Sequence, residues 1–169
     1  MKLAIIGGGG FRVPQIHEAL AAADAAVRVD ELSLHDVSDS RLATIRAILE
    51  RQQVARPPRL TTTVDLAEAL RAADFVFCAV RVGGTAGRIA DERIALDLGV
   101  LGQETVGAGG LSYALRTVPF MVHLAETVRE VAPQAWVINF TNPAGIVTEA
   151  MQSLLGERVV GICDTPIGL

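Results

Sequence analysis

Short apolar runs alternate with amphipathic stretches along the chain. The runs are residues 2–6, 31–35, 59–63, 75–80, 136–140 and 158–163. Most are nearly continuous rather than alternating, which is typical of strands that are buried on both faces. Helical periodicity fills the stretches between them, at about 13–23, 38–55, 65–72, 85–98, 111–131 and 145–155. This alternation predicts an α/β fold with a doubly wound, mainly parallel six-stranded sheet.

Local signals refine the helices of this pattern. Asp65 and Thr148 are candidate N-caps, and Pro14 falls in a first helical turn, where proline is tolerated. The two prolines in residues 55–59 predict a loop.

Composition narrows the class of protein. The chain has 169 residues, of which 50% are hydrophobic and 4% aromatic, so we expect one domain with an aliphatic core. The net charge of −4 and the absence of a Lys/Arg run argue against a nucleic-acid partner. No signal peptide and no membrane span are expected. Cys78 and Cys163 do not form a disulfide framework, and Cys78 is expected to be an inert core thiol, so we expect a soluble cytoplasmic protein.

A glycine-rich turn, "IIGGGGFRVP", follows the first predicted strand and opens the first helix. Glycines let a backbone approach a pyrophosphate with its N–H groups, and the helix dipole favours an anion there. Arg12 stands where the usual motif has its third glycine. Asp36, at the end of the second strand, is suited to a ribose hydroxyl and disfavours a 2′-phosphate, which indicates NAD rather than NADP.

These features predict a Rossmann-type NAD site, with a plain β–α turn and a surface aspartate as the alternative. The residues assigned to the cofactor are Gly7, Gly8, Gly9, Gly10, Phe11, Arg12 and Asp36.

The segment after the fourth strand is rich in charge and glycine. Arg81 ends the strand, Arg88 and Glu92 open the next helix, and the loop at 102–110, "GQETVGAGG", is able to approach a ligand. From spacing alone, Arg88 and Glu92 are best interpreted as an exposed i,i+4 pair.

Together with "NFTNPAG" at 139–145 and "CDTP" at 163–166, this segment resembles the N-terminal portion of the NAD- and metal-dependent glycoside hydrolases of family four. Within that family the chain looks most like the 6-phospho-β-glucosidases, and the resemblance covers its whole length. It implies that residues 1–169 form an NAD-binding Rossmann domain. A C-terminal domain that completes the metal and substrate site is then expected to be absent from this chain.

The resemblance also implies roles for single residues. Arg88 would lie near the phosphate of a phosphorylated disaccharide or glucoside, and Asn142 would touch substrate hydroxyls. Cys163 would bind a divalent metal, usually manganese, and Asp164 would help the leaving group depart as a catalytic residue.

The implied reaction is a redox-assisted elimination at C1–C3 of a 6-phosphoglucoside. NAD takes hydride from C3, the resulting ketone acidifies the proton at C2, the aglycone leaves, water adds and the hydride returns. Two positions depart from the family pattern. Gly10 stands where serine is common, and Asp164 resembles the α-specific phosphoglucosidases, so a 6-phospho-α-glucosidase is the alternative.

A second alternative is the nucleotide-binding domain of an NAD-dependent 2-hydroxyacid dehydrogenase, because lactate and malate dehydrogenases place an Asn-Pro at a similar strand end. "GQET" and "CDTP" count against it. Asn142 is also open to interpretation as a turn residue before Pro143.

The rest of a catalytic site is not found in the sequence. The three histidines, His17, His35 and His123, precede Cys163 and are expected to be surface or helix-face residues. Tyr113, the only tyrosine, lies outside the segment expected of a catalytic base. We therefore expect no glycosidase activity from this chain alone, and self-association as a homo-oligomer through apolar surface.

Overall fold

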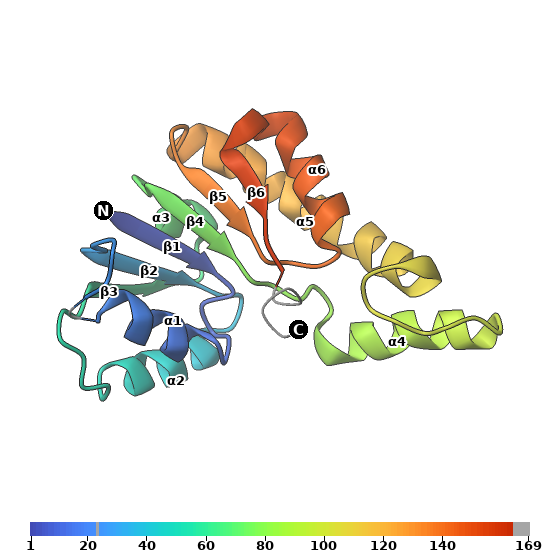
Figure 1. The fold of residues 1–169 in the computed structure, drawn as a ribbon, viewed down its shortest axis with the longest axis horizontal. Coiled ribbons are helices and arrows are strands. Elements are labelled where there is room, and N and C mark those ends of the chain that lie inside the picture. Colours follow the sequence, from blue (N-terminus) through green and yellow to red (C-terminus); the bar gives the residue numbers. More distant parts are fainter. Residues whose placement is uncertain (23, 164–169) are drawn as a thin grey trace.

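The computed structural model describes residues 1–22 and 24–163, which form a parallel sheet with helices on both faces (Figure 1). The strands are β1 (Lys2–Ile6), β2 (Glu31–His35), β3 (Arg59–Thr63), β4 (Phe75–Cys78), β5 (Trp136–Asn139) and β6 (Val159–Gly161). Their order is β3-β2-β1-β4-β5-β6, and every adjacent pair is parallel. This is the doubly wound Rossmann order, so the predicted fold class is confirmed.

The helices follow the strands in regular alternation. They are α1 (Val13–Leu20), α2 (Asp39–Leu49), α3 (Leu66–Leu70), α4 (Gly84–Asp97), α5 (Gly107–Val131) and α6 (Ala144–Leu155), with a short 3-10 turn at Gly156–Arg158.

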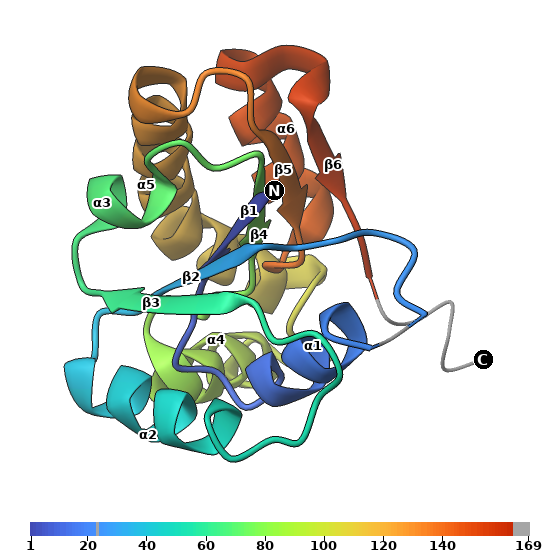
Figure 2. The same cartoon turned by 90° about the vertical axis from the view of Figure 1, so that its left-hand side faces the viewer.

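Two apolar clusters, one on each face, hold the sheet between its helices (Figure 2). Along β1, Leu3 and Ile5 face the cluster that α1 and α2 cover. Ala4 and Ile6 face the other, which α3, α5 and α6 cover. Because both faces are buried, the strands appear in the sequence as continuous apolar runs.

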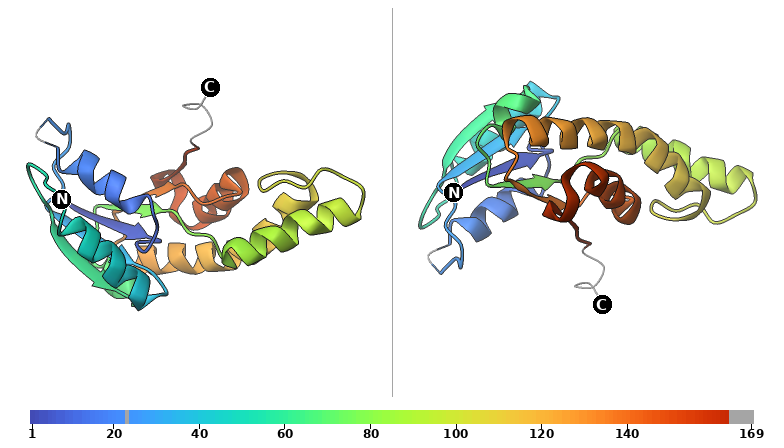
Figure 3. Two further views of the ribbon diagram at one scale, coloured as in Figure 1. Left: turned by 90° about the horizontal axis from the view of Figure 1, so that it is seen from below. Right: turned by 90° about the horizontal axis from the view of Figure 1, so that it is seen from above.

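An arm extends from this body and consists of residues 84–118: α4, the connection after it, and the part of α5 before Pro119 (Figures 1 and 3). Helix α4 packs against α5. The large apolar side chains that the arm leaves exposed are Ile89, Ile94, Leu96, Leu98, Val100, Leu101, Val106, Leu111 and Leu115.

Two of the three predicted local signals are confirmed. Asp65 caps α3, where its Oδ1 accepts the N–H of Glu68 at 2.8 Å, and Pro14 lies in the first turn of α1. Thr148 is not a cap, because α6 already begins at Ala144.

Several boundaries differ from the sequence-based prediction. Strand β4 ends at Cys78 rather than at residue 80, and α2 ends at Leu49 rather than 55. Helix α5 begins at Gly107, so the second half of the predicted glycine-rich loop is helical.

The prediction for two histidines is wrong. The exposed fractions of His17 and His35 are only 1% and 5%, because His17 faces inward from α1 and His35 lies in the buried strand β2. His123 is exposed and Cys78 is fully buried, as expected. No helix in the described ranges is long and apolar enough to cross a bilayer.

Candidate functional site

Two adjoining cavities lie at the carboxyl edge of the sheet, where the glycine turn after β1 meets the segments that follow β2, β4 and β5. The first is about 370 Å³ and the second about 730 Å³. They share Gly7, Gly10 and Phe11 of the turn and residues 79–81 after β4. In doubly wound folds, ligands bind at this edge, where the strand order reverses between β1 and β4.

Glycine is required in the turn by close backbone packing. Gly7 has φ +98°, and a Cβ there would lie 2.4 Å from the carbonyl oxygen of Ala79. A Cβ on Gly8 would lie 2.7 Å from Cβ of Leu34. The turn therefore fits between β2 and β4 only without side chains.

The amides of these glycines donate to acceptors of the protein itself. Gly7 and Gly8 both donate to the carbonyl oxygen of His35, at 2.9 and 2.7 Å, and Gly10 donates to the carbonyl oxygen of Gly7 at 2.9 Å. Their N–H groups thus build the turn. In the described chain the N–H of Phe11 donates to no acceptor, which leaves it available to an anion at the start of α1.

Asp36 lies directly after β2 and lines the second cavity together with Arg41. Its Oδ2 accepts the N–H of Gly9 at 3.1 Å, and its Oδ1 accepts the N–H of Ser38 at 3.0 Å. The carboxylate is 9% exposed and is held in one orientation by these two bonds. Arg41 belongs to no recognisable motif, so the sequence did not identify it as a site residue.

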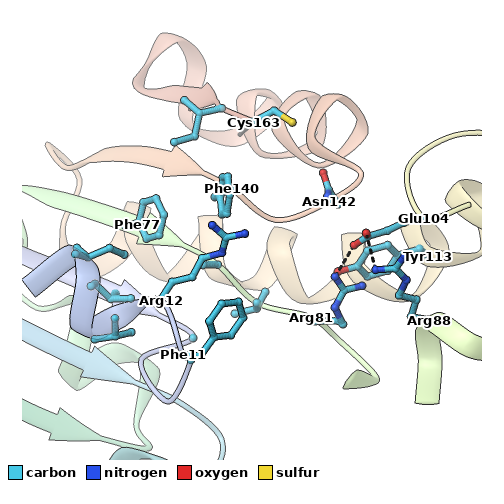
Figure 4. A pocket seen from close by; sticks show the side chains of 18 residues that line it. Phe11, Arg12, Phe77, Arg81, Arg88, Glu104, Tyr113, Phe140, Asn142 and Cys163 are labelled. Atoms are coloured by element: carbon cyan, nitrogen blue, oxygen red, sulfur yellow. Dashed lines mark ion pairs between the residues drawn. The ribbon is translucent and has the colours of Figure 1, made fainter. Parts of the chain in front are cut away.

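Arg12 lies at the first cavity between two aromatic rings (Figure 4). Its Cζ is 5.4 Å from the ring centroid of Phe11 and 5.2 Å from that of Phe140. The ring of Phe140 stacks on Phe77, with centroids 5.9 Å apart. Cation–π contacts of this length help to hold the guanidinium of Arg12 in place.

On the opposite side of the first cavity, Arg88 belongs to a charged cluster rather than to a simple surface pair (Figure 4). The expected i,i+4 contact is present, with Nε of Arg88 2.8 Å from Oε1 of Glu92. Glu104 in addition contacts Nη1 of Arg88 at 3.3 Å and Nη2 of Arg81 at 2.5 Å. Two guanidinium groups thus converge on one carboxylate in the cavity, and because Glu92 adds a second carboxylate, the four side chains together carry no net charge.

Tyr113, which the sequence analysis did not assign to the site, also lines this cavity. Its ring centroid lies 5.6 Å from Cζ of Arg81 and 5.5 Å from Cζ of Arg116, and the side chain is 2% exposed. Burial raises the pKa of the Tyr113 phenol.

A partly buried ion pair holds the arm together behind these residues. Arg116 contacts both carboxylate oxygens of Asp91, at 2.9 and 2.5 Å, and its Nε donates to the carbonyl oxygen of Val82 at 3.0 Å. The guanidinium of Arg116 holds the pKa of the Asp91 carboxyl below its ordinary value. The pair joins α4, α5 and the segment after β4, and no local sequence pattern indicated it.

Asn142 and Cys163, from the segments after β5 and β6, line the first cavity on its remaining side (Figure 4). Within the described residues no cluster of three His, Cys, Asp or Glu side chains is able to hold a metal ion. Cys163 by itself does not form a complete metal site. Asp164 lies outside the residues that the structure describes.

The family comparison and two of the most similar curated proteins indicate the same family. Residues 2–169 match the family described as family 4 glycosyl hydrolase. The chain is 44% identical to a 6-phospho-beta-glucosidase of Escherichia coli (strain K12), of which it covers 39%, and all of this chain is aligned. It is 38% identical to 6-phospho-alpha-glucosidase 1 of Lacticaseibacillus paracasei, with 99% of this chain and 39% of that protein aligned.

A solved structure is also closely similar. The 6-phospho-beta glucosidase of Thermotoga maritima, crystallised with manganese, NAD+ and glucose-6-phosphate, superposes with a TM-score of 0.92 at 34% identity. The alignment covers 99% of this chain and 41% of that one. The chain thus spans about two fifths of the length of the relatives it matches.

Proposed function

Because the chain belongs to the family 4 glycosyl hydrolases, we propose that it is the N-terminal, NAD-binding portion of a glycosidase that acts on 6-phosphoglucosides. The observation that carries the proposal is the convergence of Arg88, Asn142 and Cys163 with the glycine turn around one cavity at the carboxyl edge of the sheet. The family assignment argues against the alternative of a 2-hydroxyacid dehydrogenase. The whole protein's activity remains a proposal, since its relatives are far longer.

The residues that line the two adjoining cavities suit a dinucleotide. Asp36 and Arg41 would receive the adenosine in the second cavity, and the turn at residues 7–12 would receive the diphosphate. The first cavity then takes the nicotinamide and the sugar side by side. An acid at the Asp36 position favours a ribose hydroxyl over a 2′-phosphate, which supports NAD as the cofactor.

Three polar side chains of the first cavity suit the substrate. Arg88, with Arg81 beside it, would bind the sugar phosphate, and Asn142 would orient the sugar hydroxyls. Bound NAD would supply the hydride acceptor that makes C2 acidic through a ketone at C3. The described residues offer the thiol of Cys163 to a divalent metal, with manganese expected, but they do not complete that site, so no step is assigned to the metal. Asp164 stays a prediction as the residue that assists the leaving group.

The test uses the full-length protein with NAD, manganese and the p-nitrophenyl 6-phosphoglucosides of both anomers. Faster hydrolysis of the β-anomer is expected, and preference for the α-anomer would establish the alternative. A substrate deuterated at C2 should lose its label to solvent during turnover. Complete retention of the label would overturn the elimination route.

The proposal also covers the oligomeric state of the protein and its location in the cell. We expect a homo-oligomer, because Leu98, Leu101 and Leu115 of the arm are 69%, 74% and 72% exposed and offer apolar surface. Light scattering after size exclusion should show a mass above that of the monomer, and a concentration-independent monomer would contradict it. A cytoplasmic location suits a site whose thiol must stay reduced.

A further inference from the structure

One buried amide links the two segments that carry Asn142 and Cys163. Asn139, the last residue of β5, has no exposed surface. Its Nδ2 donates to the carbonyl oxygen of Thr141 and to Oγ1 of Thr148, both at 3.1 Å. Its Oδ1 accepts the N–H of Thr141 at 3.0 Å. Both ends of the amide are therefore satisfied within the protein.

The first branch of this network fixes the segment of Asn142. Thr141, which is 1% exposed, is held by Asn139 through both its N–H and its carbonyl oxygen. The hydroxyl of Thr141 in turn accepts the N–H of Val80 at 3.0 Å. The residue before Asn142 is thus tied to the end of β4, beside the glycine turn.

The second branch reaches the segment of Cys163. The backbone carbonyl oxygen of Asn139 accepts the N–H of Ile162 at 2.9 Å. Beside it, Oγ1 of Thr148 lies so close to Gly161 that a Cβ on this glycine would be 2.5 Å away. The end of β6 is therefore packed against the same hydroxyl that Asn139 holds.

We propose that Asn139 is a positioning residue, whose amide sets the placement of Asn142 relative to Cys163 through Thr141 and Thr148. What those two residues do for the sugar and the metal rests on the proposed function, but the coupling itself does not. Neither Asn139 nor Thr148 lines either cavity, so their effect on the reaction is exerted through the residues they hold.

The chemistry of the site requires an amide here. An aspartate at position 139 has the same shape, but its second oxygen would face the carbonyl oxygen of Thr141, where the NH2 group now donates. Buried networks of this kind specify one arrangement when all members are paired and fail when one is not.

The experiment compares four variants. Asn139→Asp replaces the NH2 donor with an acceptor oxygen. Thr148→Val removes the hydroxyl group at nearly constant volume, and Thr148→Ser keeps the hydroxyl group. Thr127→Val is the matched control, because the Thr127 hydroxyl also makes a hydrogen bond, to the carbonyl oxygen of His123 at 2.8 Å, in a helix far from the cavities.

Three quantities are measured. In the full-length enzyme, Thr148→Val is expected to lower kcat/KM for the 6-phosphoglucoside about tenfold, because small displacements of substrate-positioning groups are costly. The Kd for NAD should stay within about twofold, since Asn139 holds no cofactor contact. In the 169-residue chain, the time course of Cys163 alkylation at one fixed pH, followed by mass spectrometry, should change, because thiol reactivity follows its surroundings.

Thr148→Ser should restore both kcat/KM and the alkylation time course, and Asn139→Asp should exceed the effect of Thr148→Val. The proposal is overturned if Thr148→Val behaves like Thr127→Val in both readouts, or if NAD affinity falls in parallel with kcat/KM. Should the wild-type enzyme neither bind NAD nor turn over, the proposed function fails, and the alkylation comparison alone decides on the coupling.

Discussion

The sheet body and the arm are stabilised by different forces. In the body, Ile5, Ile6, Val76 and Leu124 are fully buried between the sheet and its helices. In the arm, the buried residues of α4 are Asp91 and Ala95, and the largest apolar side chains point to solvent. The body therefore depends on apolar burial, and the arm depends on ion pairs.

This difference separates the two tasks of the proposed site. The expected cofactor contacts lie on the body, where each glycine amide of the turn already donates to an acceptor of the protein itself. The expected phosphate contact, Arg88, lies on the arm, where Glu104 contacts Arg88 and Asp91 contacts Arg116. Sites on a densely packed scaffold are held more rigidly than sites held by charge.

The largest expected difference between the body and the arm is in the effect of replacing one leucine in each. Leu124→Ala, in the body, should lower the free energy of unfolding by about 3 kcal/mol, because it leaves a cavity among fully buried side chains. Leu115→Ala, on the arm, should change it by less than about 0.5 kcal/mol, since that side chain is 72% exposed. Urea unfolding at low and high salt measures both, and equal losses would contradict the division.

Asp91→Asn is expected to lower the stability of the arm, by somewhat less than Leu124→Ala lowers that of the body. Removing the charge leaves Arg116 without its buried partner, which costs about 2–3 kcal/mol of arm stability. Hydrogen exchange should accelerate at amides of residues 84–118 and not in β1 or β4. Glu50→Gln is the control, because the exposed Arg46–Glu50 pair is worth little. Uniform acceleration across the sheet would show that the arm is not a separate unit.

The cofactor half can be changed without disturbing the arm. Asp36→Ala should relax the preference for NAD over NADP about tenfold, because the group that disfavours a 2′-phosphate is gone. The substitution should also weaken the binding of NAD, since Asp36 orients Gly9. Calorimetry with both dinucleotides measures the ratio, and Asp39→Ala, an exposed neighbour, is the control. A wild-type chain that binds NADP as tightly as NAD would refute the role of Asp36.

The smallest expected effect is the response of the body to mild acid. Burial lowers the pKa of His35 below its ordinary 6.5. The unfolded chain then binds a proton more readily than the folded one. The stabilising contribution is complete above pH 6.5 and declines as the pH falls toward the folded pKa, by less than about 1.4 kcal/mol per pH unit. Urea midpoints across this range should fall for the wild type and stay flatter for His35→Gln.

Much of the body could be predicted because its strands are buried on both faces. The run at 2–6 coincides with β1, and the run at 31–35 coincides with β2. The start of α5 could not be predicted, because glycines at 107–110 are typical of a loop. The backbone of the preceding loop packs closely against this helix and requires glycine there, because a Cβ on Gly109 or Gly110 would lie 2.4 Å from the carbonyl oxygen of Gln103 or Thr105. Tertiary packing overrides the low helix propensity there.

Some residues of the candidate site could likewise be predicted from the sequence, and others could not. The glycine turn, Asn142 and Cys163 follow strands, so the rule that carboxyl ends of parallel strands share an edge brings them together. Tyr113, Glu104 and Arg116 meet the site through the packing of α4 on α5, which leaves no local signature. His35 shows the same limit, because its burial depends on a strand that pairs on both sides.

The central place of β1 also determines the order in which the protein can be built during synthesis. Leu3 pairs with Leu32 on one side and with Phe75 on the other. While the chain emerges from the ribosome, β1, β2 and β3 can associate early, but the second edge of β1 stays unpaired until β4 is made. Residues 79–81, which wall both cavities, arrive only then. The nascent protein thus exposes the second edge of β1 first and completes the two cavities afterwards, so this aggregation-prone interval comes before any stabilisation by a ligand.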